Sequence, residues 1–240
     1  MARTSAGNAA MRKPRNPDAS RADILRAATD EFAARGLDGA RIDAVARRTR
    51  TTRAMIYYYF KSKEGLYRAV LEEAYRGIRE AERMLDLAHL PAKEAMAELV
   101  SFTFDYYQTH PEFVALVVAE NQAGGRHIRK MQRIRRLNAS IVDTIAAVME
   151  RGRTEGTLRA DIDPIDVHMT IAALGWFEIA NRHTFGYLFR RDFRAPETIE
   201  RDRARIIDVV WQFVRAAAPA QMKPARKRPN SRGALRAQPA

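Results

Sequence analysis

Apolar residues recur at intervals of three and four along nearly the whole chain, and this spacing constrains the fold more than any other feature. An α-helix has 3.6 residues per turn, so side chains at this spacing form an apolar stripe along one helical face. β-Branched residues do not alternate with polar ones over any useful length, as half-buried strands would require. The sequence therefore predicts an all-α protein.

Proline and glycine divide this pattern into separate helices. Four of the expected helices have proline at or near their start, where the missing N–H group costs nothing. In the first helix, Ser20 and Asp23 form a predicted capping box, and Gly36 is the predicted end. The expected helices cover residues 20–35, 42–49, 53–59, 62–87, 91–109, 111–122, 126–153, 164–189 and 196–217.

Positive charge is concentrated in three places, although the chain as a whole carries a formal net charge of +13. Two of them are the ends, and we expect residues 1–19 and 218–240 to be basic, disordered segments. A solvated tail is the ordinary role of such a segment, and attraction to phosphate is the alternative. The third place is the segment 41–63, which differs from the ends because its cations lie within a helical pattern.

Two short expected helices, 42–49 and 53–59, follow the first amphipathic helix closely. Neither can bury much surface alone, so the three together predict one small unit over residues 20–65, ending in a helix-turn-helix. Its expected core consists of Phe32, Leu37, Ile42, Val45, Ala46, Ile56 and Phe60. The opposite face is polar, basic and aromatic.

The second helix of a helix-turn-helix enters the DNA major groove with its N-terminal residues against the base edges. We therefore expect Thr51, Thr52, Arg53 and Met55 to read the base sequence. An arginine fork matches two acceptors of guanine, and threonine can donate, accept or pack its methyl group against thymine.

Three consecutive tyrosines follow in the same helix. We expect Tyr57, Tyr58 and Lys63 to contact phosphates, which fixes the position of the protein without reading sequence. Tyr59 can take either role or pack in the core. Neighbours on a helix are about 100° apart, so at least one tyrosine should face outward.

The segment 28–71 closely resembles the DNA-binding domain of the TetR family of bacterial repressors. The matching residues are Phe32, Gly36, Ile42, Val45, Ala46, the run from Ile56 to Phe60, and the run from Ser62 to Leu66. The resemblance implies a homodimer that binds a pseudo-palindromic operator in double-stranded DNA. It also implies release by a small-molecule effector bound in a C-terminal helical domain, here residues 66–217.

Three positions depart from the family pattern. Arg50 stands where the family commonly has glycine in the turn, and Thr51 stands where it has valine. We expect Arg50 to keep an ordinary helical turn while bringing a cation close to the groove. Arg41 aligns with a capping threonine, so an arginine–phosphate contact is expected in place of a hydroxyl–phosphate contact.

Aromatic and aliphatic side chains gather after residue 91 in a pattern suited to an apolar pocket between helices. Ordinary core packing is the alternative role for each of them. The expected effector contacts are Phe104, Tyr107, Phe113, Val117, Asn121 and Trp176.

The last two expected helices carry stripes of apolar and small residues that would allow close approach to a symmetry mate. Pairing them would form a four-helix bundle between two chains, as in the resembled family. The alternative is that a single chain covers these stripes internally. The expected dimer contacts are Met169, Ala173, Trp176, Ala180, Ile207, Val210, Trp211 and Val214.

Several other classes of function lack a basis in the sequence. The chain has no cysteine, which excludes disulfides, thiolate zinc sites and cysteine nucleophiles. His168 and Glu178 are too far apart to form a compact metal-binding pair, and no catalytic arrangement or phosphate-binding glycine loop is present. We therefore expect no enzyme activity, no metal and no cofactor.

No apolar run approaches the roughly 18 residues of a membrane span, and no secretory signal is recognisable, so we expect a soluble cytoplasmic protein. Two rival functions stay open. One is a nonspecific basic nucleic-acid-binding protein. The other is a small-molecule-binding helical protein or enzyme that no longer uses its DNA-binding unit.

Overall fold

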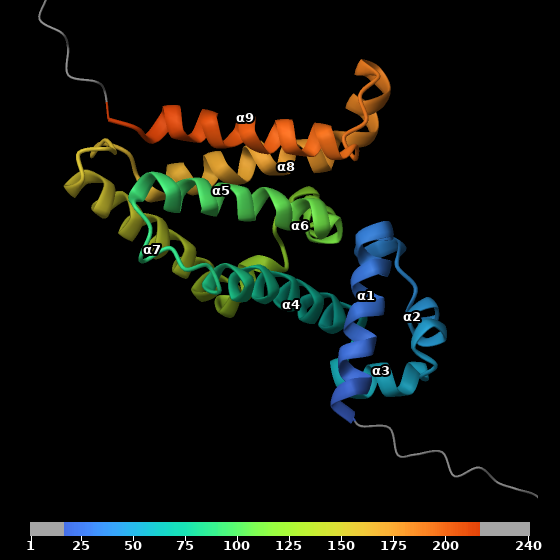
Figure 1. The fold of residues 1–240 in the computed structure, drawn as a ribbon. Coiled ribbons are helices and arrows are strands. Elements are labelled where there is room, and N and C mark those ends of the chain that lie inside the picture. The colour runs from blue at the N-terminus through green and yellow to red at the C-terminus, as the bar shows by residue number, and fades with distance from the viewer. Residues whose placement is uncertain (1–16, 217–240) are drawn as a thin grey trace, which may run out of the picture.

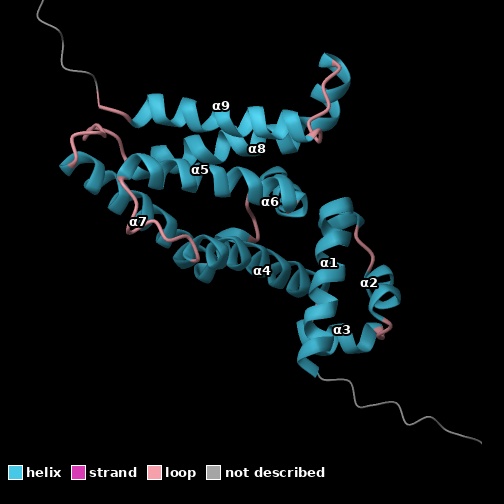
Figure 2. Ribbon diagram, in the orientation of Figure 1, coloured by secondary structure: helices cyan, strands magenta, loops and turns pink. Residues whose placement is uncertain are grey.

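The computed structural model describes residues 17–216, and helices dominate this part of the chain (Figures 1 and 2). The predicted all-α class is confirmed; within the described range, strand-like pairing is limited to one isolated bridge between Leu158 and Arg215. The elements are α1 (Pro17–Gly39), α2 (Ile42–Thr49), α3 (Arg53–Phe60), α4 (Lys63–Arg83), α5 (Ala92–Thr109), α6 (Pro111–Gln122), the short 3₁₀ helix η1 (Ile128–Lys130), α7 (Gln132–Thr154), α8 (Pro164–Phe189) and α9 (Pro196–Val214). The expected basic ends fall outside the described residues, except for 17–19, which are helical.

The first helix begins earlier than predicted. It starts at Pro17 rather than at Ser20, because proline fits the first turn, where its absent N–H group has no helical partner anyway. The backbone of Gly36 has φ 64° and ψ 179°, which is outside the helical region. Regular helix therefore stops at the predicted glycine, and a further turn continues to Gly39.

Three other helix ends also differ from the predicted ones. Helix α4 stops at Arg83, four residues early, and a break at Met131 separates η1 from α7. Helix α9 stops at Val214 because the next residues pair with another segment: Arg159 N–H donates to the Val214 carbonyl over 3.0 Å, and Ala216 N–H donates to the Thr157 carbonyl over 2.8 Å.

Helices α1 to α3 form a small unit, here called the reading head, around the first half of α4 (Figure 1). Its predicted core is confirmed: every member is buried except Leu37, which packs partly exposed against the others. The same core also takes in residues from later helices: Leu66, Tyr67, Val70, Leu71, Leu116 and Ile134. Helix α4 thus continues from the core of the head directly into the rest of the protein.

The remaining helices form the body. Helices α8 and α9 lie side by side, with α5 and α7 between them and α4 (Figure 1). One body core joins α5, α7, α8 and α9. A separate cluster joins α4, α5, α6 and α8 through Ile78, Tyr107, Phe113, Val114 and Ile179.

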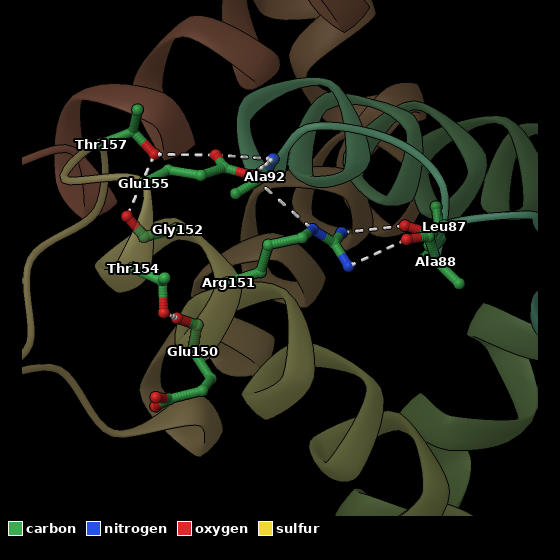
Figure 3. Close-up of polar contacts among 9 residues, drawn as sticks. All are labelled: Leu87, Ala88, Ala92, Glu150, Arg151, Gly152, Thr154, Glu155 and Thr157. Carbon is green, nitrogen blue, oxygen red and sulfur yellow. Dashed lines mark hydrogen bonds and ion pairs between the residues drawn. The ribbon is translucent and has the colours of Figure 1, made fainter.

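The end of the body farthest from the reading head is held by polar contacts from the end of α7 (Figure 3). Arg151 Nη2 donates to the Leu87 carbonyl over 2.8 Å. The carboxylate oxygens of Glu155 accept the Ala92 N–H over 3.1 and 3.2 Å. This contact satisfies a backbone N–H group in the first turn of α5. Pro91, the residue at the N-cap of this helix, makes no side-chain capping hydrogen bond. These contacts fix where α5 starts.

Candidate DNA-binding surface and effector cavity

The turn between α2 and α3 depends on an unusual backbone conformation at Arg50. Its φ of 51° and ψ of 37° lie in the left-handed region, so the expected ordinary helical turn is wrong. The conformation reverses the chain after α2 and lets Thr51 N–H donate to the Ala46 carbonyl over 3.0 Å. Glycine reaches this region without strain, whereas arginine does not.

Both helices after this turn begin with a hydroxyl cap. Thr52 accepts the Met55 N–H over 3.2 Å, and Ser62 accepts the Gly65 N–H over 2.9 Å. A Cβ atom on Gly65 would lie 2.0 Å from the Phe60 carbonyl oxygen, so only glycine permits this close approach. The Ser-Lys-Glu-Gly run therefore attaches α4 rigidly to the end of the reading helix α3.

The start of α3 presents its side chains to solvent. Thr52, Arg53 and Met55 are exposed, and Thr51 is half-buried. Arg53 Nε lies 3.4 Å from the Asp43 carboxylate of α2. A hydrogen bond with Tyr57 and the charge of Asp43 raise the pKa of Arg53 above its ordinary value. The guanidinium is thus oriented along the outer face of α3.

The three tyrosines of α3 differ in exposure, as expected for neighbours about 100° apart on a helix. Tyr58 is 69% exposed, which confirms that at least one faces outward. Tyr57 and Tyr59 are half-buried and pack against the core of the head. Tyr59 also meets the Tyr58 ring edge-on, with ring centroids 5.5 Å apart.

Two further cations flank this surface. Lys63 is half-buried, and its Nζ donates to the Asp38 carbonyl over 3.1 Å. Arg41 is exposed just before α2, and its backbone N–H donates to Glu31 Oε1 over 3.0 Å. This hydrogen bond holds the backbone of Arg41 in place, while its side chain is exposed to solvent.

A cavity of about 320 Å³ lies in the body between α4, α5, α6, α7 and α8. Four of the predicted effector contacts line it: Tyr107, Phe113, Val117 and Trp176. The other lining residues are Tyr75, Arg79, Val114, Asn138, His168 and Ala172, of which Tyr75, Arg79 and Asn138 were not singled out in the sequence. Two predicted contacts do not line it, because Phe104 is enclosed in the body core and Asn121 is exposed, with its amide donating to the Val117 carbonyl.

Arg79 is the unusual member of this lining. It is only 3% exposed, and its Nη1 lies 2.8 Å from the carboxylate of Glu82, which is also buried. Burial lowers the pKa of Arg79 and raises the pKa of Glu82 to about 7. A sequence signal existed, because Arg79 directly follows Ile78, which lies seven residues, about two helical turns, after Leu71, so Arg79 is at the edge of the apolar stripe of α4.

His168 faces the cavity from α8. Burial, and secondarily the positive charge of Arg79, lower its pKa to about 4. Its imidazole is therefore neutral near pH 7 and offers one donor and one acceptor. In the sequence analysis His168 stood out only as a residue too far from Glu178 to form a metal-binding pair.

A buried carboxylate connects the head to the body. Glu120, at the end of α6, accepts the backbone N–H groups of His127 and Ile128 over 2.7 and 2.9 Å. It also contacts His127 Nδ1 over 2.9 Å and accepts the Tyr67 hydroxyl over 3.3 Å. The Tyr67 ring in turn packs edge-on against Phe32 of α1. The start of α4, the first helix and the α6–α7 connection are thus held together at one point.

The outer face of α8 is apolar and exposed, with Met169 62% exposed and Ala173 and Ala180 also open to solvent. Val210 and Val214 are fully buried in the chain's own core, so the prediction that they contact a second chain is wrong. They belong to the inward stripe of α9, which repeats every four residues with Ile206. The other predicted contacts, Trp176, Ile207 and Trp211, are half-buried.

Comparisons with known proteins agree with this two-part arrangement. Residues 24–70 match the family described as "Bacterial regulatory proteins, tetR family", and residues 93–210 match "Tetracyclin repressor-like, C-terminal domain". The HTH-type transcriptional repressor NicS of Pseudomonas putida is 40% identical over 167 residues, covering 70% of this chain and 79% of that protein. The HTH-type transcriptional repressor SCO4008 of Streptomyces coelicolor is 36% identical over 113 residues, covering 46% and 54%.

Solved structures share the fold. The putative transcriptional regulator SCO4942 of Streptomyces coelicolor superposes with a TM-score of 0.62 at 26% identity, covering 81% of this chain and 98% of that one. The transcriptional regulator FadR of Bacillus subtilis, solved with stearoyl-CoA, has the same TM-score at 16% identity, covering 79% and 97%. None of the helices in the range 17–216 is long and apolar enough to cross a membrane.

Proposed function

The chain belongs to the TetR family of bacterial regulatory proteins, and from this premise we propose that it represses transcription by binding an operator that a small molecule in the body cavity makes it release. As a family member it binds DNA as a dimer. Two reading helices about 34–36 Å apart would then fit successive major grooves of a pseudo-palindromic site. Since its partner is DNA, we place its action in the cytoplasm, and we assign it no enzyme activity.

One observation carries the proposal: α4 belongs to both functional regions. Its first turn is held against the end of α3 by Ser62 and Gly65, while Tyr75 and Arg79 from the same helix line the cavity. A ligand that favours one position of α4 therefore also favours one position of the reading head. Release follows when the favoured conformer no longer matches the groove spacing.

Roles on the DNA side follow from position in the helix-turn-helix, since both exposed and half-buried side chains take part. We assign base reading to Thr51, Thr52, Arg53 and Met55 at the start of α3. Phosphate contacts are assigned to Arg41, Arg50, Tyr57, Tyr58, Tyr59 and Lys63, which surround it.

For the dimer, we propose the exposed apolar face of α8 with one neighbour from α9. The exposed fractions are 49% for Ile165, 62% for Met169, 49% for Phe177 and 41% for Val209. The small residues Ala173 and Ala180 lie on the same side and allow close helix approach. Burying such a face between two chains removes apolar surface from water on both.

Selection of bound fragments from random genomic DNA tests the function directly. We expect a pseudo-palindromic sequence to emerge and to outcompete random DNA by at least a thousandfold. Arg53→Ala should relax the preference at one base position by about tenfold. Lys63→Ala should weaken all sequences alike and flatten the salt dependence by about one unit.

Other outcomes would favour the rivals. Equal affinity for selected and random DNA would indicate a nonspecific nucleic-acid-binding protein. Catalytic turnover without any bound sequence would indicate a helical enzyme or carrier.

A further inference from the structure

The cavity contains a buried cation with unused hydrogen-bonding capacity. Arg79 Nε has no hydrogen-bond partner, and Nη1 contacts Glu82 as an ion pair without hydrogen-bond geometry. A guanidinium has five N–H donors in a rigid fork, and leaving buried donors unsatisfied is costly. The Arg79 guanidinium therefore lacks a hydrogen-bond acceptor within the cavity.

Glu82 does not fully supply that acceptor. Burial raises its pKa to about 7, while the charges of Arg79 and Arg83 lower it only in part. Burial therefore opposes the ionised form of Glu82. The ion pair also leaves Arg79 Nε and Nη1 without a hydrogen-bonded acceptor. A second anion in the cavity would pair with Arg79.

A second unused donor lies in the same lining. Trp176 Nε1 is buried without a hydrogen-bond partner. Asn138 donates its amide N–H to the Ile134 carbonyl over 2.9 Å, which leaves its oxygen as an acceptor. The two orphaned groups, from α4 and α8, are both donors, so a complementary ligand must carry at least two acceptors.

The walls of the cavity select a flat ligand. The rings of Tyr107 and Phe113 stack with centroids 5.8 Å apart, and Tyr75 meets Phe113 edge-on at 5.4 Å. A volume of about 320 Å³ is at the small end of the range of about 300–1,000 Å³ for ligand sites. One or two fused rings fit such a space.

We propose that the effector is a small aromatic carboxylate, whose carboxylate binds the Arg79 guanidinium and whose ring lies among the aromatic walls, with a further acceptor facing Trp176 Nε1. The proposal rests on this cavity being the effector site. The carboxylate accepts from Nε and a terminal nitrogen of the same fork, which is the planar pairing that arginine favours over lysine.

The test compares carboxylates with their neutral amides on the full chain. Benzoate and 2-naphthoate are titrated against benzamide and 2-naphthamide by calorimetry and thermal unfolding. We expect at least one carboxylate to bind tenfold or more tightly than its amide and to raise the melting temperature. Equal affinity of each carboxylate and its amide, in both pairs, overturns the proposal. The absence of binding by either carboxylate up to about 10 mM, roughly the weakest affinity worth assigning to a site, also overturns it.

Variants then locate the carboxylate. The double variant Arg79→Met with Glu82→Gln removes the ion pair together, so no charge is left buried alone, and should abolish the tenfold preference. Glu82→Gln alone should retain it. Arg76→Met changes a neighbouring arginine of α4 that pairs with Glu73 and Glu80 outside this cavity, and should also retain it. Retention of the preference by the double variant would contradict the assignment.

Trp176→Phe keeps an aromatic ring at this position but removes the Nε1 donor together with the five-membered part of the indole, and benzoate serves as the control for the lost volume. The variant should weaken carboxylates whose ring bears an acceptor, such as 3-hydroxybenzoate, more than benzoate. An equal loss for both would remove Trp176 from the proposal. Operator binding measured on the same samples separates the proposed ligand class from the proposed repressor function. Intact operator binding without any carboxylate preference would overturn the ligand class and leave the repressor function standing.

Discussion

The reading head and the body cavity use positive charge in opposite ways. The head displays exposed arginines around α2 and α3, such as Arg41, Arg47 and Arg53, whose side chains are in contact with water. The cavity holds Arg79, which is buried and incompletely partnered. Exposed charges contribute little individually and are screened by salt, so DNA affinity must be shared among many of them. A buried charge interacts strongly, so one residue can decide which ligand is accepted.

The largest expected effect comes from breaking the buried pair. Glu82→Leu leaves Arg79 buried without a counter-ion, and should lower the free energy of unfolding by about 3 kcal/mol in urea denaturation. The matched control is Asp30→Ala, which breaks the exposed pair between Asp30 and Arg48 of the head. It should cost less than about 1 kcal/mol. Similar losses for both variants would end the distinction between the two regions.

We also expect a residue of the body to make the free energy of unfolding depend on pH. The pKa of His168 is lowered to about 4, so between about pH 6.5 and 4 the unfolded chain protonates this imidazole and the folded chain does not. Stability therefore falls as the pH falls through this window, by up to about 2 kcal/mol after allowance for partial exposure.

His168→Gln should flatten this part of the curve in urea denaturation at a series of pH values. His89→Gln, which changes a histidine on the exposed α4–α5 connection, should not. The head sequence from residue 17 to 65 has no histidine. A curve unchanged by His168→Gln would show that the imidazole titrates normally.

The smallest expected effect concerns the strained turn of the head. Arg50→Gly removes the cost of holding a bulky residue at φ 51°, and should raise the free energy of unfolding by about 1 kcal/mol. It also removes a cation near the groove, so operator affinity should fall at low salt. Arg50→Asn, which tolerates the left-handed region but lacks the charge, separates the two effects. If Arg50→Gly destabilised the head, the side chain of Arg50 would hold the turn more strongly than its backbone strains it.

Much of the head was predictable because its determinants are local. The apolar spacing of Ile42, Val45 and Ile56 and the caps at Thr52 and Ser62 act within a few residues along the chain. The left-handed conformation of Arg50 was not predicted, because it is imposed by the hydrogen bonds that close α2 against α3 rather than by the residue itself.

The body was predictable only in outline. Tyr107, Phe113, Val117 and Trp176 were expected to share a pocket, since aromatic residues at helical spacing favour one. Which face of α9 packs inward was not predictable from the sequence. Ile206 and Ile207 are both apolar, and only the packing of the helices decides that Ile206 faces the core.

The sequence by itself determined an all-helical chain with a DNA-reading head, because helical periodicity, caps and breakers act over a few residues at a time. The tertiary structure alone decided that Arg79 and Trp176, nearly a hundred positions apart on α4 and α8, bring unused donors into one cavity. Burial and missing partners are properties of packed helices, and no single helix contains them.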